Sequence, residues 1–242
     1  MKLFGLIGKN IDYSFSRTHF SEKFKQEKLD CVYENFDLQS IEDFPHIFES
    51  KNICGLNVTI PYKESIIPYL DTLDSEAKAI GAVNTIKITD DKLIGCNTDH
   101  YGFKNSLTHH LKSTHKKALI LGTGGASKAV AYALESLGIE VCFVSRNPKN
   151  EQTITYDDLR IEDIQEYTII VNCTPLGTHP NIDEYPPIPY SGIGENHLLY
   201  DLIYNPSETK FLGLGKKANA QVINGLEMLR LQAEKSWEIW HS

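Results

Sequence analysis

Short apolar runs alternate with longer amphipathic segments along most of this chain, which has 242 residues. Such alternation is typical of strands that alternate with helices, and it predicts an α/β fold. The predicted strands cover 2–7, 32–38, 55–60, 83–89, 92–96, 118–121, 140–145, 168–173 and 198–203. The predicted helices cover 18–28, 44–50, 63–70 and 101–111, with one after the glycines at 122–125 and a last one from about residue 225. Asp90 and Asp91 predict a tight hairpin, and the stretch 177–195 is predicted to be a loop.

The segment 117–134 carries the most specific pattern, a short apolar strand followed by glycines and then a helix. Gly122, Gly124 and Gly125 let the backbone turn sharply and approach a ligand closely. The following helix points its free N–H groups and its positive dipole end over this loop, which favours a phosphate. A tight strand–helix turn without a ligand is the alternative, but the βαβ context matches what dinucleotide binding requires. We therefore expect a nucleotide at this loop.

The end of the next strand, 140–145, indicates which nucleotide binds. NAD enzymes usually carry an acidic residue there for the ribose 2′-hydroxyl. This chain has Ser145, Arg146 and Asn147 instead, with Lys149 nearby. A guanidinium pairs with a 2′-phosphate and stacks on adenine, so NADP is favoured over NAD. An arginine that is merely solvated is the alternative.

Composition and charge exclude several other classes of protein. The chain has no apolar run long enough to span a bilayer, and residues 1–8 lack the apolar region of a signal peptide. Its net charge of −8 argues against non-specific binding of nucleic acid. The five cysteines are scattered and the nine histidines show no ligand spacing, which favours free thiols and no metal site. We expect a cytoplasmic protein without a nucleic-acid or membrane partner.

The residues before the glycine loop have their own alternation of strands and helices, so two α/β lobes with a cleft between them are expected. Polar side chains gather at the ends of the first lobe's strands, where open α/β sheets bind ligands. Ser14 and Ser16 follow the first strand, and both hydroxyls can donate to one carboxylate. Capping of the next helix accounts for either serine equally well. Asn57 and Thr59 share one face of a later strand.

Two charged residues of this lobe are candidates for chemistry. Lys63 lies at the start of a predicted helix, where a lysine is electrostatically unfavourable, and this disfavours a merely solvated role. Asp99 ends the short run Gly95–Asp99, which lies beside a predicted strand. Asn84 lies in a second such run, Gly81–Thr85. Asp99 can alternatively cap the helix predicted from residue 101.

Several motifs together resemble those of the shikimate dehydrogenases and occur in that family's order. They are Asn57-Val-Thr-Ile-Pro-Tyr-Lys63, Gly81-Ala-Val-Asn-Thr85, Asn97-Thr-Asp99, Gly122-Thr-Gly-Gly-Ala-Ser127, Val171-Asn-Cys-Thr-Pro175 and Gly225-Leu-Glu-Met-Leu-Arg-Leu-Gln-Ala233. The resemblance covers nearly the whole chain. It implies reversible, NADPH-dependent reduction of 3-dehydroshikimate to shikimate, a step of chorismate and aromatic amino-acid biosynthesis.

Carried over residue by residue, the resemblance implies roles for individual side chains. Lys63 and Asp99 match the family's catalytic pair. The implied substrate contacts are Ser14, Ser16, Asn57, Thr59, Asn84, Tyr204 and Gln232, and the implied cofactor contacts are Gly122, Thr123, Gly124, Gly125, Ala126, Ser145, Arg146, Leu202 and Gly225. Three motifs depart from the family's usual sequences. The usual His-Ser-x-Ser-Pro is replaced by Tyr13–Arg17, Asn-Arg-Thr by Ser145–Asn147, and Asn-Thr-Asp-Gly by Asn97–His100. The departure at Ser145–Asn147 affects the expected preference for NADP over NAD, and His100 is expected to alter the wall of the cleft.

The implied reaction needs such groups. Reduction of a ketone builds negative charge on its oxygen, so a proton donor must lie within hydrogen-bond reach. Lys63 can donate that proton, and Asp99 can hold the ammonium and bond a substrate hydroxyl. A hydroxyl-rich ring accounts for the many Asn, Ser, Thr and Gln contacts, because a site that pairs several hydroxyls rejects analogues that leave them unpaired.

The C-terminal segment predicts a helix that begins near Gly225, because Asn224–Glu227 resembles a capping box. Its apolar stripe consists of Leu226, Leu229, Ala233, Trp237 and Trp240. Packing on the nucleotide lobe is the simple interpretation, whereas the resemblance implies that the helix returns to the first lobe and places Gln232 against the substrate. The expected domains are a substrate-binding and catalytic domain at 1–99, joined by helix 225–242, and a doubly wound Rossmann-type NADP domain at 100–224.

Two other functions stay open. One is a quinate/shikimate dehydrogenase that uses NAD, and the other is a catalytically silent NADP-binding regulator on the same scaffold. The presence of both Lys63 and Asp99 disfavours the second. A monomer or a homodimer is expected.

Overall fold

The computed structural model describes residues 1–12, 14–49, 52–90, 92–148 and 153–242. They form two compact units of mixed helices and strands. Unit 1 comprises Met1–Thr98 and Gln232–Ser242, and unit 2 comprises Asp99–Leu231. The predicted α/β class with two lobes is confirmed. Tyr13, Asp91 and Lys149, which the predictions name, lie outside the described residues.

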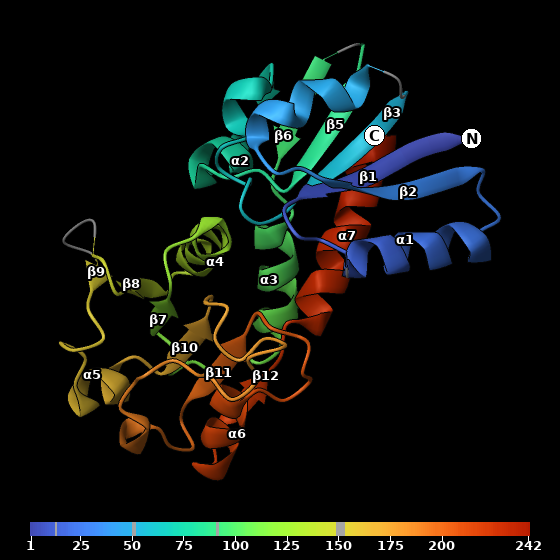
Figure 1. The fold of residues 1–242 in the computed structure, drawn as a ribbon. Coiled ribbons are helices and arrows are strands. Elements are labelled where there is room, and N and C mark those ends of the chain that lie inside the picture. Colours follow the sequence, from blue (N-terminus) through green and yellow to red (C-terminus); the bar gives the residue numbers. More distant parts are fainter. Residues whose placement is uncertain (13, 50–51, 91, 149–152) are drawn as a thin grey trace. The chain divides into compact units, whose positions relative to one another are not determined.

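Unit 1 is built on a mixed sheet of six strands in the order β2-β1-β3-β5-β6-β4 (Figure 1). The strands are β1 (Lys2–Gly8), β2 (Cys31–Asp37), β3 (Ile53–Val58), β4 (Thr72–Leu73), β5 (Thr85–Thr89) and β6 (Lys92–Cys96). β1 pairs in parallel with β2 and β3, whereas β5 is antiparallel to both β3 and β6. Thr89 pairs with Lys92, and Asp90 between them has a φ of 47°, so the predicted hairpin is present.

Helices cover both faces of this sheet because its strands alternate their buried side chains between two cores. The helices are α1 (Phe15–Gln26) and α2 (Ser75–Ile80), with two 3₁₀ helices, η1 (Ile41–Phe48) and η2 (Ile67–Tyr69). On one face Phe4 and Leu6 pack with Phe20 and Phe24 of α1. On the other face Ile7 packs with residues of β3, η1 and α2. Neighbouring residues of β1 thus serve opposite cores, as a strand requires.

Unit 2 contains a fully parallel sheet of six strands in the order β12-β11-β10-β7-β8-β9. The strands are β7 (Lys117–Leu121), β8 (Glu140–Val144), β9 (Thr153–Ile154), β10 (Ile169–Asn172), β11 (Leu198–Asp201) and β12 (Gln221–Ile223). Counted from β7, this is the doubly wound order in which the strand sequence reverses between β7 and β10. The Rossmann-type fold predicted for the second lobe is confirmed, and ligands of such sheets bind at the carboxyl ends of the strands at this reversal.

The helices of unit 2 pack on both faces of its sheet. They are α3 (Asp99–Thr108), α4 (Gly125–Ser136), α5 (Ile161–Glu166) and α6 (Lys210–Lys217), with one 3₁₀ turn, η3 (Tyr190–Gly192). Ala118 and Ile120 of β7 face a core shared with α3 and α4. Leu119 and Leu121 face the opposite core, shared with α5 and α6.

The last helix, α7 (Leu226–His241), contributes to both units. Met228 packs in the core of unit 2 with residues of α3 and α4. From Gln232 onward the helix belongs to unit 1, where Trp237 and Trp240 lie 5.4 and 4.9 Å from the ring of Phe4. The predicted return of the C-terminal helix to the first lobe is confirmed.

Two predicted helices of unit 1 have a different form. Residues 44–50 overlap η1, and 63–70 form a series of turns that ends in the 3₁₀ helix η2. Pro45 lies inside η1 and Pro68 inside η2. Proline lacks the N–H that a regular α-helix needs and its ring collides with the preceding turn, so both segments stay in short 3₁₀ form.

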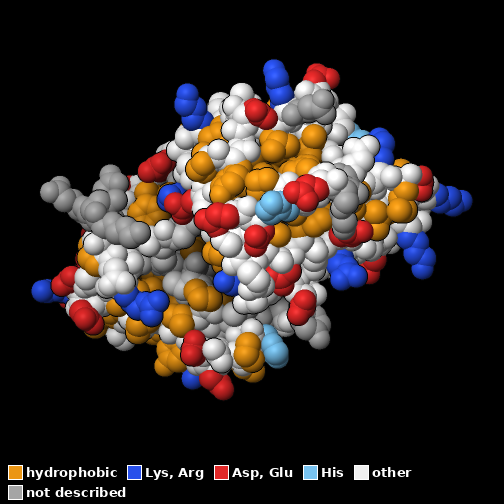
Figure 2. Space-filling view, turned by 45° about the horizontal axis from the view of Figure 1, so that its top comes forward, with side chains coloured by type: hydrophobic (Ala, Val, Ile, Leu, Met, Phe, Trp, Pro, Cys, Tyr) orange, Lys and Arg blue, Asp and Glu red, His pale blue; other side chains and the backbone are white. Residues whose placement is uncertain are grey.

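The described surface mixes charges of both signs. On the face that Figure 2 shows, acidic and basic side chains are interspersed with apolar ones. Among the described residues, every helix is too short or too polar to cross a membrane.

Candidate active site

The serines after β1 differ in what they do. Ser14 caps α1, because its hydroxyl oxygen accepts a hydrogen bond from the N–H of Arg17 at 3.2 Å. Ser16 lies in the first turn of α1 and is buried, and its hydroxyl bonds that of Tyr33. Burial raises the pKa of Tyr33 well above its ordinary value, which the bond from Ser16 only partly offsets. Ser14 therefore caps α1 through an acceptor position of its hydroxyl, which leaves its predicted role as a donor to substrate a prediction. Ser16 faces the interior of unit 1.

Asn57, at the end of β3, is held at both ends of its amide. Its Oδ1 accepts a hydrogen bond from the Tyr33 hydroxyl at 2.8 Å, and its Nδ2 donates to the carbonyl of Asn84 at 3.2 Å. Asn57 is only 4% exposed. Tyr33 thus connects two predicted substrate contacts, Ser16 and Asn57, although the sequence did not single it out. Its only sequence signal is an aromatic residue with a hydroxyl within an apolar strand.

Asn84 and Gln232 meet although they are far apart in the chain. Asn84 Nδ2 donates to Gln232 Oε1 at 3.2 Å and to the hydroxyl of Thr98 at 2.9 Å. Asn84 Oδ1 accepts from the N–H of Thr98 at 2.7 Å. Both amides are buried. Four predicted substrate contacts therefore belong to one buried hydrogen-bonded group in unit 1: Ser16, Asn57, Asn84 and Gln232.

Thr59 and Lys63 follow β3 in the chain. Thr59 lies one residue beyond the strand, and the N–H of Tyr62 donates to its carbonyl at 2.9 Å. Lys63 is half-buried in the turn that follows, where its carbonyl accepts from the N–H of Val83 at 2.7 Å. Since no α-helix begins at Lys63, the predicted unfavourable helix dipole is absent there, and that argument for its role is wrong. The other argument for its role, its position after the carboxyl end of β3, is unaffected.

Asp99 is the first residue of α3 and of unit 2, and it is 5% exposed. The helix begins two residues earlier than predicted, so Asp99 lies in its first turn rather than before it. A carboxylate there interacts favourably with the positive end of the helix dipole. His100 follows, and its ring packs edge-on against Tyr132 of α4 at 5.4 Å.

The glycine loop has the conformation that the sequence predicts. Gly122 has a φ of +105°, which favours glycine, and its N–H donates to the carbonyl of Val144 at 2.8 Å. Gly124 caps α4, and a Cβ added there would meet nothing within 4 Å. The first N–H groups of α4 have no partners within the helix, as at any helix start. Open space over such a helix start fits a phosphate.

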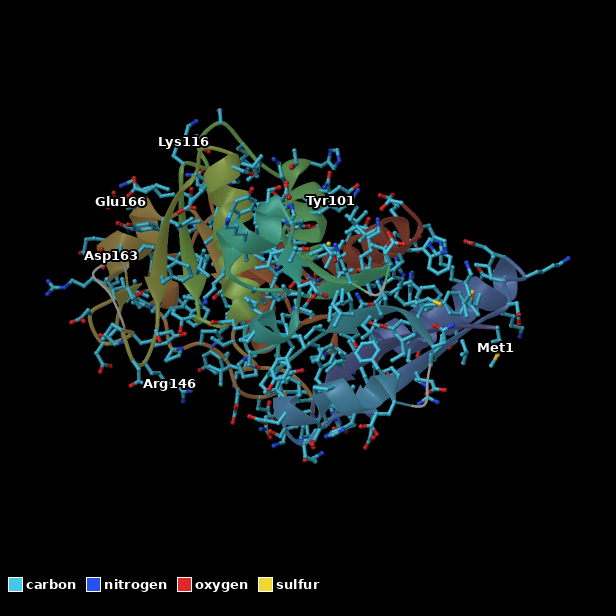
Figure 3. All side chains as sticks on the ribbon, turned by 90° about the horizontal axis from the view of Figure 1, so that it is seen from above. Met1, Tyr101, Lys116, Arg146, Asp163 and Glu166 are labelled. Atoms are coloured by element: carbon cyan, nitrogen blue, oxygen red, sulfur yellow. The ribbon has the colours of Figure 1, made fainter. Side chains whose placement is uncertain are left out.

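The end of β8 carries Ser145 and Arg146. The Ser145 hydroxyl accepts from the N–H of Asn147 at 3.3 Å and so closes a turn. Arg146 is exposed, and Figure 3 shows it on the outside of the protein. Burial raises the pKa of the Tyr156 hydroxyl to about 12, and the positive charge of Arg146 opposes this rise.

Gly225 and Leu202, both predicted to contact the cofactor, lie directly against each other. A Cβ on Gly225 would come within 2.1 Å of the Leu202 carbonyl oxygen, so only glycine fits there. The N–H of Gly225 donates to the carbonyl of Ile203 at 3.1 Å. Asn224 accepts from the N–H of Leu226 at 3.2 Å, which supports the predicted start of α7. Tyr204, two residues after Leu202, is 36% exposed, and partial burial raises its pKa.

A buried polar group at the ends of β10 and β11 was not predicted. Asp201 Oδ1 accepts from Asn172 Nδ2 and from the N–H of Ile203, both at 3.0 Å, and its Oδ2 accepts from the Thr209 hydroxyl at 2.6 Å. Asn172 Oδ1 in turn accepts from the Thr174 hydroxyl at 2.7 Å. Burial raises the pKa of Asp201 to about 6. The sequence signal for this group is a polar residue at the end of each of two apolar runs, Asn172 in one and Asp201 in the other.

Comparison with known proteins decides the family. A model described as the shikimate dehydrogenase substrate binding domain matches residues 6–86. A curated relative from Clostridium botulinum, named shikimate dehydrogenase (NADP(+)), is 41% identical over 98% of this chain and 95% of its own length. This chain belongs to the shikimate dehydrogenase family.

Solved structures of shikimate dehydrogenases agree with this assignment. One, in complex with NADP⁺, is 36% identical and has a TM-score of 0.87, with 99% of this chain and 90% of that one covered. Another, from Thermus thermophilus in complex with NADP(H) and shikimate, is 31% identical with a TM-score of 0.88, covering 99% and 93%. The resemblance predicted from the motifs is confirmed, and so is the fold class.

Proposed function

We propose that this protein interconverts 3-dehydroshikimate and shikimate with NADP as its cofactor, and that Lys63 and Asp99 handle the proton. The observation that carries the proposal is membership of the shikimate dehydrogenase family over 98% of the chain. The reaction is a step of chorismate and aromatic amino-acid biosynthesis. The finer assignments of residues rest on the motifs and on where the described structure places them.

The residues of unit 2 fit NADP. Its phosphates would lie over Gly122–Ala126, where Gly124 leaves open space at the start of α4. Ser145 and Arg146, at the end of β8, would hold the ribose 2′-phosphate. Leu202 and Gly225, whose backbones lie in close contact, would bound the nicotinamide. When bound, the cofactor supplies the hydride, and the protein supplies placement.

Substrate binding falls mainly to unit 1. Its proposed contacts there are Ser14, Ser16, Asn57, Thr59, Asn84 and Gln232, with Tyr204 contributed by unit 2. Amides and hydroxyls suit a ring that carries several hydroxyl groups, because each group then finds a partner. Four of these contacts already have fixed side-chain orientations through the buried hydrogen bonds described above, which reduces the ordering cost of binding.

Lys63 is the proposed proton donor to the carbonyl oxygen in the reductive direction. An ammonium also stabilises the negative charge that develops on this oxygen. In the oxidative direction the neutral amine accepts the proton from the substrate hydroxyl. Asp99 is assigned to a hydrogen bond with a neighbouring substrate hydroxyl.

Two further properties belong to this proposal. All five cysteines are free thiols, which suits the reducing cytoplasm where we place the protein. We assign a monomer or a homodimer, and light scattering of the purified protein distinguishes these from larger assemblies.

The activity is tested by NADPH formation when shikimate and NADP⁺ are added to the purified protein. The proposal predicts turnover that is much faster with this pair than with quinate or with NAD⁺. Faster turnover of quinate with NAD⁺ would favour a quinate/shikimate dehydrogenase. Binding of NADP without any turnover of shikimate would overturn the proposal in favour of a silent regulator.

A further inference from the structure

Ser236 occupies a central position in the buried polar group of unit 1. It lies on α7, one turn after Gln232, and is fully buried with 0% exposure. Asn57 Nδ2, on β3, donates a hydrogen bond to its hydroxyl oxygen at 2.9 Å. The Thr85 hydroxyl, on β5, lies 2.7 Å away, and that of Thr98, after β6, lies 3.2 Å away. One hydroxyl thus connects α7 with three neighbouring segments of the sheet.

The hydrogen-bonding capacity of this hydroxyl is fully used. A serine hydroxyl offers one donor and two acceptor positions. It donates to the carbonyl of Gln232 at 2.9 Å. Asn57 Nδ2 fills one acceptor position, and the hydroxyls of Thr85 and Thr98 both lie within reach of the other. The same atom therefore bonds the main chain of one proposed substrate contact, Gln232, and the side chain of another, Asn57.

These bonds also determine which way the amide of Asn57 points. Its Oδ1 accepts from Tyr33 and its Nδ2 donates to Ser236, at 2.8 and 2.9 Å. The other acceptors near Nδ2 are more distant, the carbonyl of Asn84 at 3.2 Å and the hydroxyl of Thr85 at 3.3 Å. Without the Ser236 hydroxyl, Nδ2 keeps only these longer bonds, so the amide is held firmly at its Oδ1 end alone.

We infer that Ser236 is a positioning residue for substrate binding: it fixes the amide of Asn57 and the turn of α7 that carries Gln232, without itself contacting substrate. This inference rests on the proposed function, since Asn57 and Gln232 are substrate contacts only in that reaction. A side chain that is already held by hydrogen bonds loses less entropy when it binds substrate. The bonds of Ser236 should therefore contribute to substrate affinity more than to the rate of the chemical step.

The first test is Ser236→Ala, measured by steady-state kinetics with shikimate and by direct binding of NADP. Alanine is a good helix former, so α7 is preserved. The KM for shikimate should rise by about threefold to tenfold, the range of one net hydrogen bond. Turnover and the Kd for NADP should stay near the wild-type values, because the hydrogen bonds of Ser236 go to residues other than Lys63 and the glycine loop.

Ser106→Ala is the matched control. Ser106 is also a buried serine on a helix, and it donates to a carbonyl of its own helix, that of Phe103, at 3.0 Å. It also lies 2.7 Å from a second hydroxyl, that of Tyr200. It belongs to unit 2, and neither of these partners is a proposed substrate contact. The two variants should lose similar thermal stability, and only Ser236→Ala should change the KM for shikimate.

A double-mutant cycle tests whether Ser236 acts through Asn57. In the Asn57→Ala background the effect of Ser236→Ala on KM should shrink markedly, since the supported amide is gone. Tyr33→Phe removes the hydroxyl at the other end of the same amide and should raise KM in the same way, so it replaces Ser236→Ala if that variant does not fold.

The outcomes separate the inference from the proposed function. If the wild-type protein does not turn over shikimate, the proposed function fails. If the wild type is active and Ser236→Ala has the same KM as Ser106→Ala, the inference is wrong. Effects of Ser236→Ala and Asn57→Ala that simply add would also contradict it.

Discussion

Asn57 shows how a single side chain of unit 1 is held by distant parts of the chain, because Tyr33 of β2 bonds one end of its amide and Ser236 of α7 bonds the other. A polar residue that closes an apolar run is visible in the sequence, as with Asn57 in unit 1. The groups that hold it, Tyr33 and Ser236, come from segments whose proximity only the folded chain reveals. Neither lies at the end of an apolar run, so pattern alone does not mark them as part of a site.

Arg146 is a residue whose role depends on one contact. Its guanidinium is exposed at the end of β8, and the first residues after that strand, Ser145–Asn147, include no acidic one. Arg146→Ala should weaken binding of NADPH by about 10–150-fold, the loss of one charge-assisted pair, and should weaken NADH far less. Fluorescence titration with both cofactors measures this. Equal weakening of the two would mean that Arg146 stacks on adenine and does not bind the 2′-phosphate.

Asp201 makes stability depend on pH. Burial raises its pKa from an ordinary value of 3.8 to about 6 in the folded protein. A raised folded pKa favours the folded state most below pH 3.8, and this advantage is lost as pH rises through 6. Asp201→Asn cannot titrate.

The free energy of unfolding of the wild type, relative to that of Asp201→Asn, should therefore fall between about pH 4 and pH 6.5 by at most about 3 kcal/mol and then level off. Urea denaturation at a series of pH values measures the difference. A difference that is independent of pH would show that the Asp201 carboxyl titrates alike in the folded and unfolded chain.

Elements were predictable where they are long and periodic. The principal strands of both sheets, together with α1, α3, α4 and α7, were expected within a few residues of their observed ends. The missed elements are β4, β9, β12, α2, α5, α6 and η3, which are two to eight residues long. Segments so short do not complete enough turns or alternations to show a period, and packing in the two units stabilises them instead.

The helix α7 carries a prediction of its own. Gln232 lies where α7 enters unit 1, and its Oε1 accepts from Asn84 and Thr98 over long distances of 3.2 and 3.4 Å. Gln232→Ala should raise the KM for shikimate, lower kcat, or both, while the Kd for NADP and the Tm stay close to wild type. Glu238→Ala, an exposed change on the same helix, is the control. Unchanged shikimate kinetics in Gln232→Ala would refute a role for this helix in substrate binding.

At the scale of the whole molecule, the chain folds into two units, and the proposed function assigns a different task to each. The expected boundaries after residues 99 and 224 compare with structural boundaries after Thr98 and Leu231. The difference at the second boundary arises because the first turns of α7 pack in the core of unit 2 through Met228. Lys63 therefore belongs to unit 1, and Asp99 and the proposed NADP contacts belong to unit 2.

The central claim is that Lys63 supplies the proton in shikimate chemistry, and Lys63→Ala tests it most directly. We predict that kcat falls by about 10²–10⁴-fold, the usual contribution of general acid–base catalysis, while the Kd for NADP stays nearly unchanged. Lys78→Ala, which removes an exposed lysine from α2 of the same unit, controls for loss of charge and should leave kcat as in the wild type. Near-normal turnover of shikimate by Lys63→Ala would contradict the account.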